Sequence, residues 1–189
     1  MRNLIFFMHT SLDGFVATLK GELDWVKLDD AMFDFVGTIT QQADTALYGR
    51  VTYEMMESYW PTAASQPNAS KHDIEHSEWY NGVPKIVLSR TMKNAGPGVT
   101  VISENLVDNI NKFKNQPGKN IVIFGSPSAA NSLLNEGLVD EFWLFVNPIL
   151  LGEGIPLFEG VPATVNLKLS ENKLFDAGVM ALHYRTNNH

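Results

Sequence analysis

The residues with the clearest potential for chemistry lie where a short apolar run ends, between Thr45 and Glu54. This stretch reads as a buried strand, a glycine turn and the first turn of a helix. Gly49 would permit an unusual backbone angle or a close approach, and Arg50 and Thr52 would lie at the helix start. Free N–H groups and partial positive charge at a helix N-terminus, together with a guanidinium and a hydroxyl, suit a phosphate. The segment therefore predicts a nucleotide site, and a plain strand and turn with a surface arginine is the alternative.

Two further apolar runs, at residues 85–88 and 121–124, end in the same way. They are followed by small, hydroxylic or basic residues, namely Ser89, Arg90 and Thr91 after the first and Gly125, Ser126 and Ser128 after the second. Open α/β sheets bind ligands at the carboxyl ends of their strands, so we expect one shared crevice. Free N–H groups near Ser126 and Ser128 could hold a pyrophosphate, and ordinary helix capping is the alternative.

Two other motifs carry weaker signals. Gly152 and Gly154 lie in a glycine-rich stretch that lacks a third glycine and a following amphipathic helix, so a plain turn is expected, or a tight loop closing over a ligand. His72 and His76 are one helical turn apart, a spacing that can ligate zinc. Their segment is polar and offers no evident third ligand, which favours a solvated surface helix and no metal.

Acidic and aromatic residues gather between the first predicted strand and the first predicted helix. The acids are Asp13, Asp24, Asp29, Asp30 and Asp34. One of them, facing a crevice, could donate a proton or bind an amine, whereas most should serve as caps, turns or solvent-facing charges. Trp25 and Phe33 are expected in the core or in the wall of a cleft.

The elements that would position these residues alternate along the chain, which predicts mostly parallel pairing with an antiparallel edge. The predicted strands are Leu4–Met8, Ala46–Tyr48, Lys85–Leu88, Val99–Ile102, Ile121–Phe124, Glu141–Val146, Val165–Glu171 and Val179–Arg185. Helices are predicted after Asp29 or Asp30, after Asn105, and from Ser126 or Ser128 to Gly137. The longest loop is expected from Pro61 to Ser70.

Composition narrows the function classes. The chain has 189 residues, 44% of them hydrophobic and 19% charged, a balance that predicts one globular domain over residues 1–189. A net charge of -7 disfavours nucleic acid as a partner. The sequence contains no cysteine, which excludes disulfides, thiolate metal sites and cysteine nucleophiles. The absence of a signal-peptide pattern and of a long apolar run predicts a cytoplasmic protein without a membrane partner.

The order of motifs along nearly the whole chain resembles the dihydrofolate reductase-like family. Its reductase domains from bifunctional riboflavin-biosynthesis deaminase-reductases are the most similar. The motifs that carry the resemblance are Ser11-Leu-Asp13-Gly14-Phe-Val-Ala17, Gly49-Arg50-Val-Thr52-Tyr-Glu54, Leu88-Ser89-Arg90-Thr91, Phe124-Gly125-Ser126, Gly137-Leu-Val-Asp140-Glu-Phe142 and Pro148 to Phe158.

The resemblance implies an α/β fold with a mixed, mostly parallel eight-stranded sheet, flanking helices, an antiparallel C-terminal edge and bound NADPH. It implies that Gly49, Arg50 and Thr52 reach the cofactor phosphates and that Ser89, Arg90 and Thr91 face the adenosine 2′-phosphate. Gly125, Ser126 and Ser128 correspond to the pyrophosphate turn. Ala17 corresponds to the loop beside the nicotinamide ribose, and Gly152 and Gly154 would close the site from the opposite side.

The function expected from this resemblance is NADPH-dependent reduction of a small heterocycle that is pterin-, folate- or ribosylaminopyrimidine-like. Trp25 and Phe33 would form the substrate wall, and Asp30 or Asp34 would be the catalytic carboxylate. Two departures matter: the glycine pair of folate reductases is Gly125-Ser126 here, and neither aspartate is an unambiguous pteridine ligand. The alternatives are a non-catalytic nucleotide-binding module with the same fold, or a pterin or flavin binder with a different cofactor. A homodimer is plausible.

Overall fold

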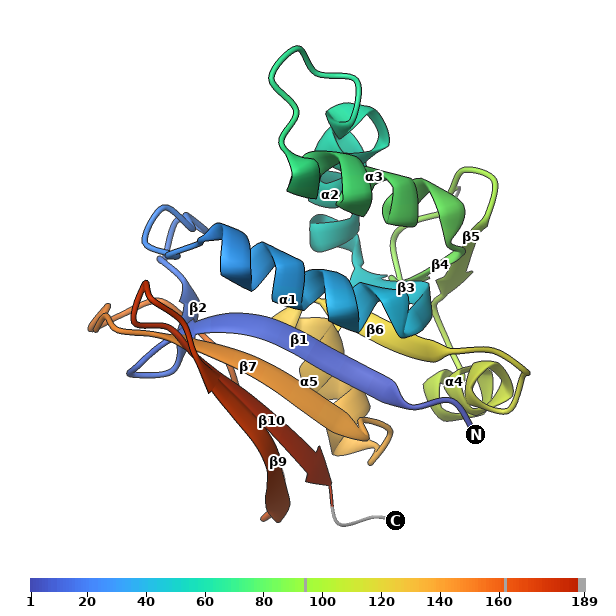
Figure 1. Cartoon of the computed structure of the whole chain (residues 1–189). Helices are drawn as coiled ribbons and strands as arrows, with labels where there is room; N and C mark the ends of the chain where they lie inside the picture. Colours follow the sequence, from blue (N-terminus) through green and yellow to red (C-terminus); the bar gives the residue numbers. More distant parts are fainter. Residues whose placement is uncertain (94, 162, 187–189) are drawn as a thin grey trace.

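An eight-stranded sheet forms the centre of the protein in a computed structural model that describes residues 1–93, 95–161 and 163–186 (Figure 1). Its strands are β1 (Leu4–Ser11), β3 (Ala43–Gly49), β4 (Lys85–Leu88), β5 (Val99–Ile102), β6 (Asn120–Phe124), β7 (Glu141–Asn147), β9 (Leu167–Leu174) and β10 (Met180–Thr186). Their spatial order is β5-β4-β3-β6-β1-β7-β10-β9. The first six are parallel, and β10 and β9 add an antiparallel edge. Each of these strands overlaps a predicted one.

Helices cover both faces of the sheet (Figure 1). They are α1 (Asp30–Gln41), α2 (Arg50–Ala63), α3 (Lys71–Gly82), α4 (Leu106–Lys114) and α5 (Pro127–Asn135). One core lies between the sheet and α4 and α5, and contains Phe6, Ile110 and Leu133. The other lies on the α1–α3 side and contains Phe7 and Met32. Alternate residues of β1 thus enter opposite cores, as strand geometry requires.

Three predicted helices start in two different ways. Asp29 caps α1, and its Oδ1 accepts a hydrogen bond of 2.7 Å from the Met32 amide. Asn105 precedes α4 and Ser126 precedes α5, both with a left-handed backbone and without a side-chain cap bond. The three predicted helices are therefore confirmed, although two of them start without the expected capping interaction.

The structure corrects several sequence-based boundaries. The predicted loop from Pro61 to Ser70 is shorter, because α2 continues past Pro61 to the buried residue Ala63. The strand β9 starts at Leu167 instead of Val165, and its residues are exposed on both faces. A short antiparallel pair, β2 (Phe15–Ala17) and β8 (Ile155–Pro156), was not predicted.

The prediction of a solvated surface helix around His72 and His76 is wrong for one side of α3. His76, Ser77 and Tyr80 are buried, and only the remaining face of the helix meets solvent. The segment has almost no apolar periodicity, because histidine, serine and tyrosine supply its inward face. Its burial therefore follows from packing on α1 and α2 and from ring contacts with Tyr48 and Phe124 of the sheet, and not from a recognisable apolar stripe.

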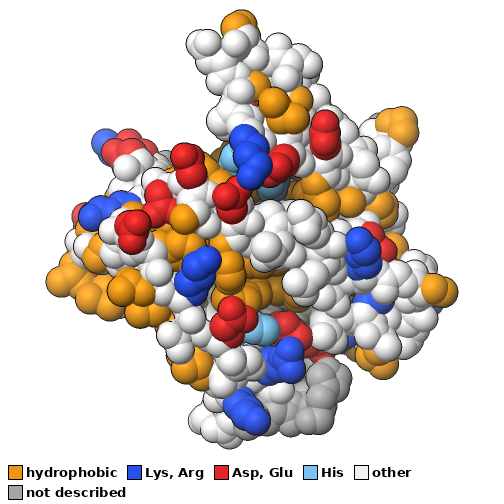
Figure 2. Space-filling view, viewed as in Figure 1, with side chains coloured by type: hydrophobic (Ala, Val, Ile, Leu, Met, Phe, Trp, Pro, Cys, Tyr) orange, Lys and Arg blue, Asp and Glu red, His pale blue; other side chains and the backbone are white. Residues whose placement is uncertain are grey.

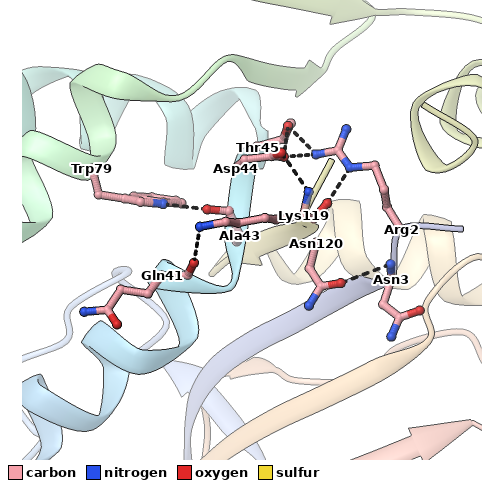
Figure 3. Close-up of polar contacts among 9 residues, drawn as sticks. All are labelled: Arg2, Asn3, Gln41, Ala43, Asp44, Thr45, Trp79, Lys119 and Asn120. Carbon is pink, nitrogen blue, oxygen red and sulfur yellow. Dashed lines mark hydrogen bonds and ion pairs between the residues drawn. The ribbon is translucent and has the colours of Figure 1, made fainter. Parts of the chain in front are cut away.

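Buried polar groups fasten the amino ends of the central strands (Figure 3). Arg2 is 6% exposed, pairs with the Asp44 carboxylate and donates to Thr45 Oγ1 at 2.6 Å. The Lys119 amide donates to the same carboxylate at 2.8 Å, which joins the starts of β3 and β6. This network lies at the amino ends of the strands, opposite the strand ends at which the sequence predicts a nucleotide site. Its charges are structural.

Candidate active site

A cavity of about 1420 Å³ lies at the carboxyl ends of β1, β3, β4, β5 and β6. It extends from the α1–α3 face across the edge of the sheet to α5 and the start of α4. Most of the cofactor residues inferred from the sequence line it, namely Ala17, Gly49, Arg50, Thr52, Ser89, Arg90, Gly125, Ser126 and Ser128. Parallel pairing brings these strand ends together, which is why local motifs far apart in the chain share one surface.

The turn between β6 and α5 has the conformation of an anion-binding site. Gly125 and Ser126 both have positive φ, at 62° and 58°, and α5 follows with Pro127 at its first position. Successive backbone N–H groups in such a turn converge on a concave surface, and the following helix N-terminus adds partial positive charge. A left-handed serine costs of order 1 kcal/mol, so the surrounding structure must hold it there.

Ser126 is held by the end of β3. Its Oγ accepts a hydrogen bond of 2.9 Å from the Gly49 amide. Gly49 itself has an ordinary extended conformation at φ -77°, so it is not needed for an unusual angle. A Cβ at position 49 would lie 3.5 Å from Ala129 Cβ and 3.7 Å from Ser126 Cβ. Both distances are ordinary contacts, so the described chain itself does not require a glycine at this position.

The basic and hydroxyl side chains after β3 and β4 differ in whether they already bond to other groups of the protein. Arg50 forms an exposed ion pair of 2.8 Å with Glu54, one turn along α2. Arg90 is exposed at the cavity and has no ion pair with a described residue. Ser89 Oγ accepts hydrogen bonds from the Thr91 and Met92 amides at 3.2 and 2.9 Å. Thr91 lies outside the described cavity lining. Because Arg50 is paired with Glu54, Arg90 is the cation most available to a ligand.

Gly152 and Gly154 shape the site from behind its lining. A Cβ at Gly154 would lie 2.4 Å from the Ala17 carbonyl oxygen, so only glycine lets β8 pack this closely on β2. The Gly152 amide donates to Asp13 Oδ2 at 2.8 Å. Hydrogen bonds from the Ser11 hydroxyl and from the Gly152 and Leu151 amides lower the pKa of Asp13. Asp13 thus anchors the loop that supports Ala17, which itself lines the cavity.

The two aspartates expected to act on the substrate do not reach the cavity in this structure. Asp30 is exposed in the first turn of α1, and Asp34 pairs with Lys71 of α3 at 2.6 Å. Met32 and Val36 occupy the cavity side of α1. Phe33 lines it as well. At 100° per residue, Asp34 lies on the opposite side of the helix, and Asp30 lies to one side of the lining residues, one turn before Phe33. The described cavity lining therefore contains no carboxylate of α1.

Of the two expected wall residues, the structure brings one to the cavity. Phe33 lines it and stacks on His72, with ring centroids 4.0 Å apart. Trp25 is half-buried outside the described lining, and its Nε1 donates to the Glu22 carbonyl at 3.3 Å. The wall is thus built from α1 and α3, and the segment before α1 contributes aliphatic side chains to its rim.

Sequence reasoning missed most of the aromatic residues in this part of the cavity. We define the aromatic end of the cavity as the part lined by Phe7, His9, Phe33, Trp60, His72, His76 and Phe124. The rings of His72 and His76 are 5.4 Å apart, and Trp60 lies 4.1 Å from His76. No group of three metal-binding side chains occurs among the described residues. The histidine spacing was noticed in the sequence, but only the fold places these rings in a cavity.

Burial keeps the histidines of the aromatic end neutral. It lowers the pKa of His9 to about 4 and that of His76 to about 3. Burial also lowers the pKa of His72. A neutral imidazole can donate one hydrogen bond and accept another, so these side chains offer polarity without charge.

We expect His76 to make the protein less stable in mild acid. Its pKa is below the unfolded value of 6.5, so the unfolded state binds more protons as the pH falls below about 6.5. The free energy of unfolding should therefore fall by roughly 2 kcal/mol between pH 7.5 and pH 5 on account of this group. Urea unfolding of wild type and His76→Phe at both pH values measures it. The variant should lose about 2 kcal/mol less, and an equal loss in both proteins would contradict the expectation.

The strand end after β5 adds residues that the sequence motifs did not indicate. Ser103, Glu104 and Asn105 line the cavity beside the end of β4. Asn105 has a left-handed φ of 50° at the start of α4. No apolar-to-basic pattern marks this strand end, so only its pairing with β4 reveals it.

The fold and cavity define an α/β protein of the dihydrofolate reductase-like class with a strand-end site of nucleotide size. The family described as RibD C-terminal domain matches residues 2–181, and the chain belongs to this family. A search of curated proteins finds the uncharacterized protein YyaP of Bacillus subtilis, 36% identical over 98% of this chain and 96% of its own length.

Two solved structures share the fold at lower identity. The diaminohydroxyphosphoribosylaminopyrimidine deaminase/5-amino-6-(5-phosphoribosylamino)uracil reductase of Thermotoga maritima has a TM-score of 0.68 and 13% identity, over 98% of this chain and 56% of that one. Dihydrofolate reductase from Enterococcus faecalis, complexed with NADP(H), has a TM-score of 0.65 and 17% identity, over 98% and 97% of the two chains. These likenesses concern the fold. No helix in the described ranges has the length and apolar character to cross a membrane.

Proposed function

We propose that this protein is an NADPH-dependent reductase of a small heterocyclic molecule. One observation carries the proposal: a single cavity joins an anion-binding turn and an available arginine to a buried aromatic end. The first part suits a phosphorylated dinucleotide, and the second suits a flat ring. Membership of the RibD C-terminal domain family and the NADP(H) complex of a protein with the same fold support this reading.

Residues in different parts of the cavity would bind different parts of the cofactor. The turn at Gly125 and Ser126 and the start of α2 would bind the pyrophosphate, and Arg90 would bind the adenosine 2′-phosphate. Ala17 and the adjoining strand ends would orient the nicotinamide toward the aromatic end, where packed rings exclude water. When bound, reduced nicotinamide supplies a hydride. Asp30 and Asp34 receive no role in this proposal, because they lie outside the described cavity lining.

We expect Arg90→Ala to weaken NADPH binding about ten- to a hundredfold and to leave NADH binding nearly unchanged. An arginine–phosphate hydrogen bond is worth about 1.5–3 kcal/mol, and NADH lacks the 2′-phosphate that would receive it. Nucleotide fluorescence titrations measure both affinities. Lys93→Ala is the matched control, since Lys93 is an exposed neighbouring cation outside the described cavity lining.

Two results would contradict the assignment of Arg90. One is an equal loss of affinity for both cofactors. The other is a wild-type preference for NADH, which the Glu104 carboxylate at the neighbouring strand end would favour through a ribose hydroxyl.

The non-catalytic module is separated from the reductase by turnover. NADPH consumption is followed with pterin, dihydrofolate and ribosylaminopyrimidine substrates at cofactor saturation. A reductase oxidises NADPH with at least one of them at a rate above the substrate-free control. Tight NADPH binding without consumption on any of these substrates would instead favour a binding module with this fold.

A further inference from the structure

The strand ends of β4 and β5 place opposite charges at neighbouring positions on the cavity. The two strands pair in parallel, with Leu88 opposite Ile102. Arg90 and Glu104 each lie two residues beyond this pair, and both line the cavity. The Ser89 amide donates to the Ile102 carbonyl at 3.0 Å, so the pairing continues toward them. We define the β4–β5 end of the cavity as the part lined by Ser89, Arg90, Ser103, Glu104 and Asn105.

These two charges do not neutralise each other. Within the described ranges, no ion pair joins Arg90 or Glu104 to another residue, and both residues are exposed. Arg50, by contrast, is paired with Glu54 at 2.8 Å. A guanidinium offers only donors, and an ionised carboxylate offers only acceptors. Each is therefore available to a complementary group of a ligand without first breaking an ion pair.

The start of α4 holds the backbone that carries Glu104. Asn105 has a left-handed φ of 50°, and its carbonyl accepts a hydrogen bond of 3.0 Å from the Asn109 amide. Asn109 Nδ2 donates to the Glu104 carbonyl at 3.0 Å. These bonds involve the backbone of Glu104 and not its carboxylate. The structural role left for the carboxylate is its favourable charge beside a helix N-terminus.

The molecule as a whole is acidic, so selection for an additional phosphate has to be local. The chain carries a net charge of -7, and Figure 2 shows acidic side chains gathered over the first half of α1 and the adjacent part of α3. A field of this sign disfavours the 2′-phosphate that distinguishes NADPH from NADH, which adds a charge of about -1.5 to -2. At the β4–β5 end, Arg90 opposes this field and Glu104 adds to it.

NADH and NADPH favour opposite charges beside the adenosine ribose. NADH presents two ribose hydroxyls, which can donate hydrogen bonds to a carboxylate, and such bonds are stronger than those between neutral groups. NADPH presents a phosphate, which a guanidinium binds and a carboxylate repels. In α/β dinucleotide sites, an acidic residue on the ribose favours NAD, and an arginine accommodates NADP. Here both residue types occur at adjacent strand ends.

We propose that Glu104 is a specificity-determining residue, which binds the adenosine ribose hydroxyls of NADH and opposes the 2′-phosphate of NADPH. This inference rests on the proposed function, because it concerns the cofactor of the same cavity. Arg90 and Glu104 then set the cofactor preference together, with opposite signs. Arg90 favours NADPH, and Glu104 retains affinity for NADH.

Two substitutions of Glu104 test this assignment by nucleotide fluorescence titration of the full-length protein. Glu104→Gln removes the charge at constant side-chain length, so NADPH should bind about threefold more tightly and NADH about threefold more weakly. Glu104→Ala also removes the acceptor atoms and should weaken NADH about tenfold. The preference for NADPH should therefore rise about tenfold or more in both variants. An unchanged preference in either variant overturns the proposal, even where the melting temperature shows that the start of α4 is affected.

Arg90→Ala provides the complementary test. With Glu104 in place, this variant should prefer NADH, because only the carboxylate remains at the β4–β5 end. The double variant Arg90→Ala/Glu104→Gln should bind the two dinucleotides with similar affinities. A double variant that prefers NADH as strongly as Arg90→Ala alone overturns the assignment of Glu104.

Adenosine fragments and a matched carboxylate locate the effect. AMP and adenosine 2′,5′-bisphosphate are titrated as competitors of NADPH, and Glu104→Ala should weaken AMP relative to the bisphosphate by the same factor as NADH relative to NADPH. Asp108→Asn is the control, because Asp108 is an exposed carboxylate in the first turn of α4 outside the described cavity lining. No change in the fragment ratio, or an equal change of preference in Asp108→Asn, overturns the proposal.

The outcomes distinguish this inference from the proposed reductase. Binding of both dinucleotides, with an unchanged preference in the Glu104 variants, overturns the inference and leaves the cofactor assignment intact. Binding of neither dinucleotide to the wild-type protein overturns the cofactor assignment and the inference with it. A shifted preference in the Glu104 variants, without turnover of any substrate, supports the assignment of Glu104 within a nucleotide-binding module.

Discussion

Gly125→Val is expected to weaken NADPH binding at least a hundredfold while the protein remains folded. Gly125 has a φ of 62°, a left-handed conformation that a β-branched residue avoids. A Cβ there would also lie 3.3 Å from Thr52 Cγ2, at the place where β6, α5 and α2 converge. Valine would displace the turn and obstruct the approach of a pyrophosphate to its N–H groups.

The fold should survive this change because the strain is local. A residue forced into a sparsely populated backbone region costs about 1–3 kcal/mol, against a typical domain stability of about 5–15 kcal/mol. Circular dichroism and an NADPH fluorescence titration on one sample measure both properties. Gly98→Val is the matched control, since Gly98 has a φ of 78° with open space around it and lies at the amino end of β5.

Two results would contradict the assignment of this turn to the cofactor site. A folded Gly125→Val protein with normal NADPH affinity would show that the turn is only a structural connection. Equal loss of affinity in Gly98→Val would attribute the effect to backbone strain in general. Because both glycines have a left-handed φ, a large loss in the first variant only would attribute the effect to the position of this turn at the cavity.

The strand-end chemistry was predictable because its signals are local. An apolar run followed by glycine, serine or arginine marks the ends of β3, β4 and β6, and parallel pairing then brings these ends together. The aromatic end lacked such a signal. His9 is one polar residue near the end of an apolar strand, and α3 reveals its inward face only through the sheet and helix it packs on. The tertiary contacts of His9 and of α3 place them at the cavity, and the periodicity of a single sequence does not reveal such contacts.

The carboxylates of Asp30 and Asp34 on α1 show a different limit of prediction from the sequence. Asp30 and Asp34 were selected by resemblance to a family, while the helical spacing of Met32 and Val36 already placed Asp34 on the opposite side of α1 and Asp30 to one side. The periodicity was the more reliable guide here. Buried charges such as Arg2 and Lys114 were not predictable at all, because their partners Asp44 and Asp140 are distant in the chain.

The buried pair of Lys114 and Asp140 leads to the largest expected effect on stability. Lys114 Nζ lies 2.6 Å from Asp140 Oδ2, and the two side chains are 5% and 6% exposed. The same carboxylate accepts the Leu4 amide at 2.7 Å, so the pair joins the end of α4 to the start of β1. Lys114→Met keeps the length of the side chain but leaves a buried carboxylate without this cation. We expect a loss of about 3–5 kcal/mol in the free energy of unfolding.

Urea unfolding at neutral pH measures this loss, and the chain supplies a control of the same geometry. Lys71 Nζ lies 2.6 Å from Asp34 Oδ1, but these side chains are 68% and 60% exposed. Lys71→Met should therefore cost no more than about 1 kcal/mol, as exposed ion pairs do. The two distances are equal, but Lys114 Nζ also donates to the Leu138 carbonyl at 3.1 Å, so the difference between the variants reports burial together with this hydrogen bond. Equal losses in the two variants would mean that burial does not determine the contribution of the Lys114 pair, and that solvent or a shift of the backbone reaches Asp140 when the lysine is removed.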